Sequence, residues 1–334
     1  MSSAVVIEAP GEHRLVEHTP REPAVGEALV RVHAVGICGS DREVYQGNRP
    51  EGYVRYPLTP GHEWSGTVEA VGARVPSTLV GRKVVGEGFR NCQVCDRCHA
   101  GETTLCTAGY EETGFTQPGA MAGTLTLPAR LLHALQDDAD LTAAALLEPA
   151  ACIAAAAIKA NALPGARVAV VGTGTLGMFA VQFLKAGSPA ELLVVGTRLD
   201  RAELSKVFGA TDFRTKDQEL PDDFDVVIET AGSASGARTA ASLLRRGGRL
   251  VLTGIPGPAA EGLDPTDLVV RQLEVQTVFG APPEAWAHAV RAFGAGLLNP
   301  LLLVTHELPL GEFPQAIELV GSGDPKVGKV LLHP

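Results

Sequence analysis

The stretch RVAVVGTGTLG, residues 167–177, joins a short apolar run to three glycines in the spacing G-x-G-x-x-G. The run Arg167–Val171 predicts a buried strand, and Leu176–Ala186 has the period of an amphipathic helix. In this context the first glycine permits a tight turn, the second lets a pyrophosphate approach the backbone, and the third lets helix and strand pack closely. The stretch therefore predicts a dinucleotide bound at a helix N-terminus. The residues predicted to contact it are Gly172, Gly174, Thr175, Leu176 and Gly177.

The order of strand, turn and helix recurs after this stretch. Two further units follow, Glu191–Val195 with Arg201–Phe208 and Val226–Glu229 with Ala237–Leu244. Such alternation predicts an α/β fold with a doubly wound parallel sheet of the Rossmann type. Its predicted limits are residues 146–282.

Residues 1–145 have a different pattern, with short valine-rich runs separated by Gly and Pro turns. This pattern predicts an antiparallel, barrel-like β domain. The helix candidate Pro283–Phe293 and the strand candidate Val327–Leu332 lie in residues 283–334, which we expect to return to the first domain. The strand candidates of the first domain are Ala4–Glu8, Ala28–Ala34, Trp64–Val71 and Arg82–Gly86.

Length, charge and composition limit the classes of function that the chain can have. A length of 334 residues favours two domains, and a net charge of −10 argues against a nucleic-acid partner. The longest apolar stretch, Leu141–Leu163, contains Glu148, Pro149 and Lys159, so we expect a buried or inter-domain helix there and no membrane span. The N-terminus, MSSAVVIEAPGEH, does not resemble a secretory signal, so an oxidising compartment is not indicated.

Four cysteines lie close together in the pattern C-x2-C-x2-C-x7-C. Tetrahedral zinc takes four thiolates in closed structural sites, and C-x2-C spacing brings two sulfurs to one ion. Two disulfides are the alternative, but they require an oxidising compartment, and the spacing fits no ferredoxin run. We therefore predict a structural zinc lobe at residues 90–107, with ligands Cys92, Cys95, Cys98 and Cys106.

The end of the second strand of the parallel sheet bears on the choice of cofactor. An NAD enzyme would have Asp or Glu there for the ribose 2′-hydroxyl, but this chain has Gly196, Thr197 and Arg198. A glycine removes the repelling side chain, while the Thr hydroxyl and the Arg guanidinium can bind a 2′-phosphate. The residues predict NADP(H). Asp200 could still reach the ribose, and Arg201 could either add to the phosphate site or face solvent.

Two further segments, GICGSD at residues 36–41 and PGHEWSG at residues 60–66, have metal-ligand residue types. Together with the four-cysteine lobe and the glycine turn, in this order, they make the whole chain resemble the zinc-dependent medium-chain dehydrogenase/reductase family. Alcohol, sorbitol, threonine and glucose dehydrogenases belong to it. The short motifs PGHEWSG, VVGEG and GFTQPGA are also similar to motifs of dehydrogenases that oxidise aminocyclitols.

The resemblance implies a GroES-like catalytic domain and two zinc ions per chain. Cys38 and His62 would bind the catalytic zinc, with Glu63 as an additional or exchanging ligand. The remaining ligand would be Glu148 in the segment LLEP, with Cys152, one helical turn later, as the competitor that we take for a core cysteine. The resemblance also implies a cytoplasmic homodimer or homotetramer.

The resemblance implies further roles near Cys38. Ser40 would take the alcohol proton, and Asp41 would orient His62, since metal-bound imidazoles need a partner on the other nitrogen. Asp41 could instead be an ordinary turn residue. The position of a relay histidine found in some members is Glu43 here, so the proton's exit path stays open.

The expected activity is hydride transfer between NADP(H) and a secondary alcohol or ketone. Residues 42–49 and 111–116, which we expect to line the pocket, are polar and favour a polyol, sugar-like, aminocyclitol or amino-alcohol substrate. They could instead be solvated loops. Two other functions stay open: a zinc-independent quinone or enone reductase of the same fold, and a non-catalytic NADPH-binding protein.

Overall fold

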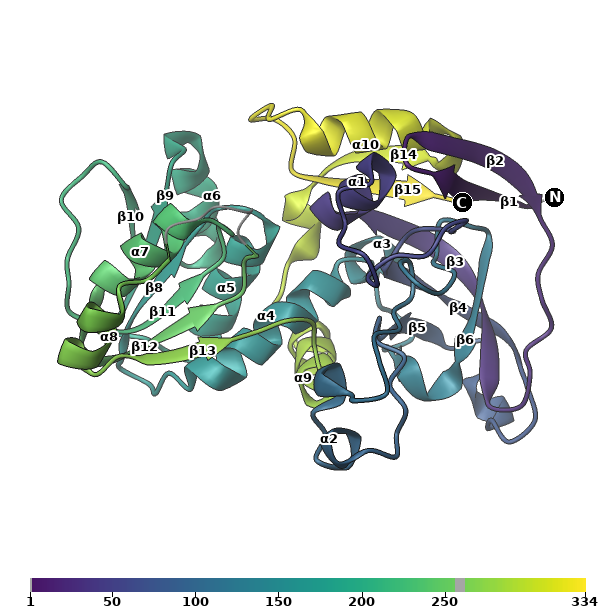
Figure 1. The fold of residues 1–334 in the computed structure, drawn as a ribbon, viewed down its shortest axis with the longest axis horizontal. Helices are drawn as coiled ribbons and strands as arrows, with labels where there is room; N and C mark the ends of the chain where they lie inside the picture. The colour runs from purple at the N-terminus through teal and green to yellow at the C-terminus, as the bar shows by residue number, and fades with distance from the viewer. Residues whose placement is uncertain (1, 256–261) are drawn as a thin grey trace. The chain divides into compact units, whose positions relative to one another are not determined.

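A six-stranded sheet, entirely parallel, surrounds the strand β8 that precedes the glycine turn (Figure 1). The strand order is β10-β9-β8-β11-β12-β13, so the chain builds outward from β8 in one direction and then crosses back to β11. This order is that of the doubly wound dinucleotide-binding fold, and its switch point lies at the carboxyl ends of β8 and β11. The strands are β8 Arg167–Val171, β9 Glu191–Gly196, β10 Asp212–Thr215, β11 Phe224–Glu229, β12 Leu244–Leu252 and β13 Glu274–Thr277.

Apolar strands explain why this sheet forms. Residues 168–171 of β8 and 192–196 of β9 are all buried, as expected for parallel strands covered on both faces. The helices of this part are α4 Leu147–Ala160, α5 Thr175–Ala186, α6 Ala202–Phe208, α7 Ala234–Ser242 and α8 Pro265–Arg271. Of these, α5 is buried along most of its length, because residues 178–184 are apolar except for Gln182.

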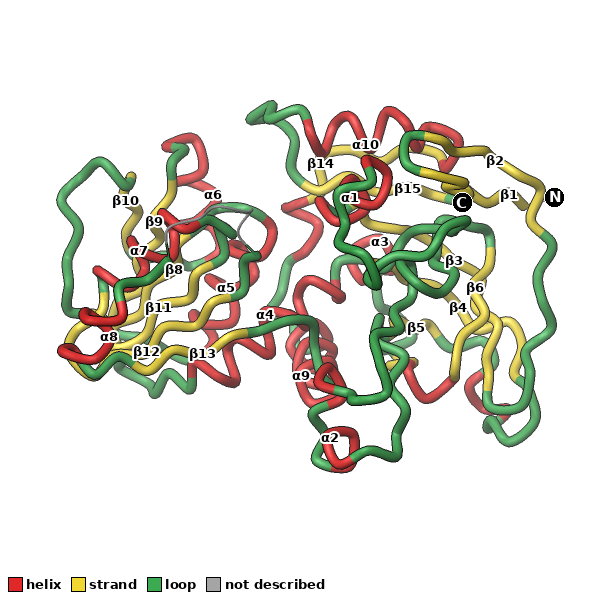
Figure 2. The backbone as a smooth tube through the Cα atoms, viewed as in Figure 1, coloured by secondary structure: helices red, strands yellow, loops and turns green. Residues whose placement is uncertain are grey.

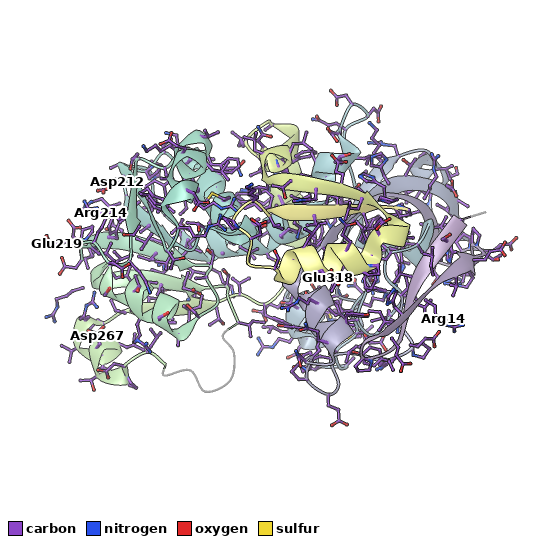
Figure 3. All side chains as sticks on the ribbon, turned by 90° about the horizontal axis from the view of Figure 1, so that it is seen from above. Arg14, Asp212, Arg214, Glu219, Asp267 and Glu318 are labelled. Carbon is purple, nitrogen blue, oxygen red and sulfur yellow. The ribbon has the colours of Figure 1, made fainter. Side chains whose placement is uncertain are left out.

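The edge of the parallel sheet at β10 is charged. Arg214 Nε lies 3.1 Å from Asp212 Oδ2, and Arg214 also donates to the carbonyl of Glu219 at 2.8 Å (Figure 3). Charged side chains on an edge strand discourage pairing with another sheet.

The other sheet is mixed. Its order is β14-β15-β3-β4-β5-β7, with β6 also paired to β3; β14 and β15 are parallel and the other pairs are antiparallel. A separate hairpin joins β1 to β2. The strands are β1 Ser2–Ala9, β2 Glu12–His18, β3 Glu27–Ile37, β4 Glu63–Val71, β5 Lys83–Gly86, β6 Thr124–Pro128, β7 Leu132–Ala134, β14 Val304–Pro309 and β15 Lys329–His333.

Short helices complete this part, as the secondary-structure colouring shows (Figure 2). They are α1 Gly39–Gln46, α2 Asp96–His99, α3 Leu141–Ala144, α9 Pro283–Gly294 and α10 Phe313–Gly321. Trp64, Phe115 and Phe313 belong to one buried apolar cluster, which includes residues of β3, β4, β15 and α10. The cluster fixes the end of β3 and the start of β4, which carry the candidate metal ligands.

This computed structural model describes residues 2–255 and 262–334, which form two units. One consists of Met1–Glu148, Pro282–Gly294 and Asn299–Pro334, and the other of Pro149–Ala281 and Ala295–Leu298. The α/β fold with a GroES-like and a Rossmann part is the predicted one. The predicted domain limits stay a prediction, because a compact unit is not thereby an independently folding domain. Within the described residues, no helix is long and apolar enough to cross a membrane.

Candidate metal centre and cofactor site

Three predicted metal ligands meet where β3 ends and β4 begins. One ligand atom each of Cys38, His62 and Glu63 lies within 4.8 Å of the other two. Cys38 directly follows β3 and is the N-cap of α1, while Glu63 is the first residue of β4. Thiolate, imidazole and carboxylate are the donor types that zinc prefers, so the residues present fit that ion.

Asp41 lies beside the imidazole of His62. Its Oδ2 accepts a hydrogen bond from the backbone N–H of Cys38 at 2.9 Å, and its Oδ1 lies 3.5 Å from His62 Nδ1. The Asp41 side chain is fully buried and that of His62 is 6% exposed. Burial lowers the pKa of His62, but the Asp41 carboxylate and Cys38 outweigh it, so this pKa lies well above its ordinary value. The arrangement directs Nδ1 to Asp41 and leaves Nε2 for another partner.

Lys329 is a site residue that the sequence did not reveal. Its ammonium forms an ion pair with Glu63, and the two side chains are 6% and 1% exposed. Sheet register explains the pairing: Gly36 lies opposite Glu63 on one side and Leu331 on the other. A Cβ at position 36 would collide with the Glu63 carboxylate, so glycine is required there. A single lysine in an apolar strand was the available signal, but strand patterning cannot supply its partner.

Glu148 and Cys152 do not belong to the three-residue group among the described residues. Glu148 lies in the first turn of α4. Burial, with Glu63 and Glu112 nearby, raises the pKa of Glu148 to about 7, while His62 acts in the opposite direction. Cys152 is half-buried. The assignment of Glu148 as a fourth ligand therefore stays a proposal that its electrostatic surroundings support.

Ser40 is half-buried in the first turn of α1, two residues after Cys38. Glu43, one helical turn later, is exposed. The helix places Ser40 near the metal ligands and leaves Glu43 toward solvent.

The four-cysteine lobe has the geometry of a single tetrahedral site. Its four sulfurs lie within 4.8 Å of one another, and its four cysteines form no disulfide. The Sγ atoms of Cys92 and Cys98 are 3.9 Å apart, against about 3.8 Å for two thiolates bound to one tetrahedral zinc. Hydrogen bonds from the backbone N–H groups of Thr107 and Cys98 lower the pKa of Cys95 to about 5, which favours the thiolate that zinc binds. The residues fit zinc.

The glycine turn has the predicted local form. Gly172 has φ of +118°, and a Cβ there would collide with Thr230. A Cβ on Gly177 would collide with the carbonyl oxygen of Gly172, so helix α5 packs against the turn only with glycine at that position. Gly174 is the N-cap of α5 without a side-chain cap, and among the described residues no atom beyond its chain neighbours and its own helix lies within 4 Å of its Cβ position. Open space at an uncapped helix N-terminus fits a pyrophosphate group.

A buried carboxylate at the end of β11 supports this turn and was not predicted from the sequence. Glu229, the last residue of β11, accepts hydrogen bonds from the backbone N–H groups of Ala231 and Gly232 at 2.8 and 3.0 Å. It thereby holds residues 230–232, of which Thr230 and Ala231 lie against Gly172. Burial raises the pKa of Glu229 although these N–H groups oppose the change.

The end of β9 has no carboxylate, but one lies close by. Arg198 donates two hydrogen bonds to Asp200, at 3.1 and 2.5 Å. Arg201 is half-buried, and burial together with Arg198 lowers its pKa. Gly196 has a packing role as well, since a Cβ there would lie 2.5 Å from the methyl group of Thr173. The two arginines make this end of the strand positive, and Asp200 partly compensates them.

Comparison with known proteins defines the class. Residues 24–137 match the alcohol dehydrogenase GroES-like domain, and residues 175–295 match the zinc-binding dehydrogenase domain. An L-threonine 3-dehydrogenase of Anaeromyxobacter dehalogenans is 31% identical over 334 residues, covering 95% of this chain and 94% of its own.

Solved structures agree with this class. The cobalt- and zinc-bound thermostable alcohol dehydrogenase of Pyrobaculum aerophilum has a TM-score of 0.89 at 31% identity and covers 100% and 99% of the two chains. A zinc-binding dehydrogenase of Sinorhizobium meliloti bound to NADP has a TM-score of 0.92 at 26% identity, with the same coverage. The chain belongs to the zinc-dependent medium-chain dehydrogenase/reductase family, which confirms the family predicted from its motifs.

Proposed function

We propose that the protein transfers hydride between NADP(H) and a secondary alcohol or ketone at a zinc site formed by Cys38, His62 and Glu63. The convergence of these three side chains within 4.8 Å carries the proposal. Zinc with an open ligand position supplies a Lewis acid that stabilises negative charge on a substrate oxygen. Glu148 is the fourth candidate ligand, and the four-cysteine lobe holds a second, structural zinc.

The residues around the site have distinct tasks in this proposal. Asp41 holds the His62 ring by its Nδ1 edge, and Lys329 compensates the buried charge of Glu63. Ser40 accepts the proton of the alcohol and passes it outward. Each of these side chains is set by a strand end or by the first turn of α1, which keeps the geometry rigid.

NADP(H) is the proposed cofactor. Gly172, Gly174, Thr175, Leu176 and Gly177 would hold the pyrophosphate, and Gly196, Thr197, Arg198 and Arg201 would surround the 2′-phosphate. The positive end of β9 supports this preference over NAD(H). In the structure of a relative from Escherichia coli, 25% identical, the cofactor is NADH, so members of the fold differ in this respect.

The proposed substrates are polyols, sugar-like alcohols, aminocyclitols and amino alcohols. The names of relatives, which include L-threonine 3-dehydrogenase, support a substrate with more than one polar group. A cytoplasmic homodimer or homotetramer is proposed from the family resemblance.

The test is NADP+ reduction by purified zinc-loaded protein with a panel of aminocyclitols, polyols, aldoses, threonine-like amino alcohols and simple secondary alcohols. Zinc-dependent turnover of a polyhydroxylated or amino-bearing compound would support the proposal. Absence of turnover with the whole panel, in both directions, would contradict it.

Two rival functions predict different metal contents. A zinc-independent enone reductase and a non-catalytic NADPH-binding protein need at most the structural zinc, whereas the proposed dehydrogenase needs two ions per chain. The presence of Cys38, His62 and Glu63 in one group favours the dehydrogenase.

A further inference from the structure

The loop at residues 112–121 lies directly against the loop that carries His62. The backbone N–H groups of Gly119, Ala120 and Met121 donate to the carbonyls of residues 59–61 at 2.7 to 2.9 Å. A Cβ on Gly114 would lie 2.9 Å from the backbone of Gly61. Side chains from the first loop are therefore held beside the candidate metal centre.

A stack of three planar groups joins this loop to the metal ligands. The Arg49 guanidinium lies 3.8 Å from the centre of the Phe115 ring, and that ring lies 4.7 Å from the imidazole of His62. The Arg49 side chain is only 11% exposed. It also donates to the hydroxyl of Tyr110 at 3.0 Å.

Glu112 adds a buried carboxylate to this cluster. Its side chain is 7% exposed, and its Oε2 accepts a hydrogen bond from Tyr110 and lies 3.9 Å from Arg49. Burial raises the pKa of Glu112 while His62 acts in the opposite direction, and Glu112 in turn helps to raise the pKa of Glu148, as expected for a carboxylate close to both.

The second carboxylate oxygen of Glu112 is not used. Among the described residues, no donor forms a hydrogen bond to Oε1. Gly88 faces this oxygen, and a Cβ at position 88 would lie 3.0 Å from it. Oε1 is not among the fully enclosed side-chain atoms that lack a partner, so a donor of a bound molecule can reach it. The combination of free oxygen, facing glycine and neighbouring histidine indicates a place for a donor from a bound molecule.

We propose that Glu112 determines substrate specificity by accepting a hydrogen bond from a second donor on the substrate, a hydroxyl or amino group near the reacting carbinol. This inference rests on the proposed function and deepens it. Arg49 and Tyr110 fix the Oε2 end of the carboxylate, so Oε1 is held in place for the substrate. A monohydric alcohol leaves Oε1 without a partner and is therefore a poor substrate.

The effect is measurable as a ratio. We expect the kcat/KM of a donor-bearing alcohol to exceed that of its monohydric analogue by about a hundredfold or more, because a site built for a hydrogen bond rejects the analogue that lacks it. Glu112→Gln keeps a neutral acceptor and should reduce the ratio for an amine roughly tenfold while affecting a hydroxyl less. Glu112→Leu removes the acceptor and should abolish the preference for both.

The experiment uses the zinc-loaded full-length protein with NADP+. Its substrates are cyclohexanol, trans-1,2-cyclohexanediol and trans-2-aminocyclohexanol, which share one ring and one reacting carbinol. The matched control is Glu111→Gln: Glu111 is the adjacent carboxylate, but its side chain is 43% exposed and pairs with Arg55. Melting temperature, zinc content and NADPH binding establish that each variant is folded.

The outcomes distinguish the proposed role of Glu112 from the proposed dehydrogenase function. Loss of the preference in the Glu112 variants, with Glu111→Gln like the wild type, supports the inference. An unchanged ratio in Glu112→Gln and Glu112→Leu, an equal change in Glu111→Gln, or a wild-type protein without preference overturns it and leaves the dehydrogenase function intact. No turnover of the three alcohols by the wild type overturns this inference, and no turnover of the whole substrate panel in either direction overturns both.

Discussion

Replacing Lys329 with methionine should destabilise the zinc-free protein, because Glu63 would keep a buried charge without its counter-charge. The two side chains are 6% and 1% exposed, so solvent cannot take over the role of the lysine. Removal of one partner of a buried ion pair costs about 3–5 kcal/mol of unfolding free energy. Because 1 kcal/mol corresponds to roughly 2–4 °C in a domain of this size, we expect the melting temperature to fall by about 6–20 °C.

A double-mutant cycle tests this reasoning in protein from which zinc has been removed, because a zinc ion bound to Glu63 would itself compensate the charge. The variants are Lys329→Met, Glu63→Gln and the double variant, each followed by calorimetry and urea unfolding. The double variant should recover most of the lost stability, since neither charge is then left buried alone. A Lys329→Met protein as stable as the wild type, or strictly additive effects, would refute the account of this pair.

Three further predictions concern other parts of the chain. Cys95→Ser should remove one zinc ion per chain and make residues 90–107 sensitive to protease, as metal analysis and limited proteolysis would show; unchanged zinc content would contradict the structural site. Arg198→Ala should raise the KM for NADP+ about tenfold to a hundredfold and that for NAD+ little, whereas Asp200→Ala should lower the KM for NADP+; equal effects on both cofactors in steady-state kinetics would exclude a 2′-phosphate contact. Burial opposes ionisation of Asp225, but Arg245 at 2.7 Å and a backbone N–H hold its pKa below its ordinary 3.8. The contribution of Asp225 to the free energy of unfolding is thus present above pH 3.8 and lost as the pH falls through the folded-state pKa. In urea unfolding, Asp225→Asn should lower the free energy of unfolding by roughly 1 kcal/mol or less at neutral pH, and this difference should disappear in acid. A difference that is independent of pH would contradict this assignment.

Local patterns predicted the parts of the fold that depend on local interactions. The strand Arg167–Val171 has the bounds that the sequence predicts, and α5 begins one residue before its predicted start. The prediction for α7 was displaced: the helix spans Ala234–Ser242, not Ala237–Leu244. Ser233 caps it by accepting a hydrogen bond from Gly236, and Leu244 already belongs to β12. The serine at position 233 was a signal for the start of the helix, but the prediction rested on apolar periodicity and did not use it.

Non-local contacts at the site could not be predicted from the sequence. The pairing of Lys329 with Glu63 depends on the register of three strands that are distant in the chain. The two arginines of the polar segment at residues 42–49 also have different surroundings, which composition does not show. Arg49 is buried on Phe115, whereas Arg42 lies against Gly321 of α10. Only the folded chain distinguishes an arginine near the metal centre from one that packs on a helix.

Zinc stoichiometry and NADP(H)-linked turnover of Cys38→Ser, measured side by side with the wild type, test the central claim most directly. The account predicts two zinc ions per wild-type chain and one per variant chain, with NADPH binding retained and alcohol oxidation lost. A Cys38→Ser protein that keeps both zinc ions, or that turns over alcohol as fast as the wild type, would contradict the assignment of the catalytic centre.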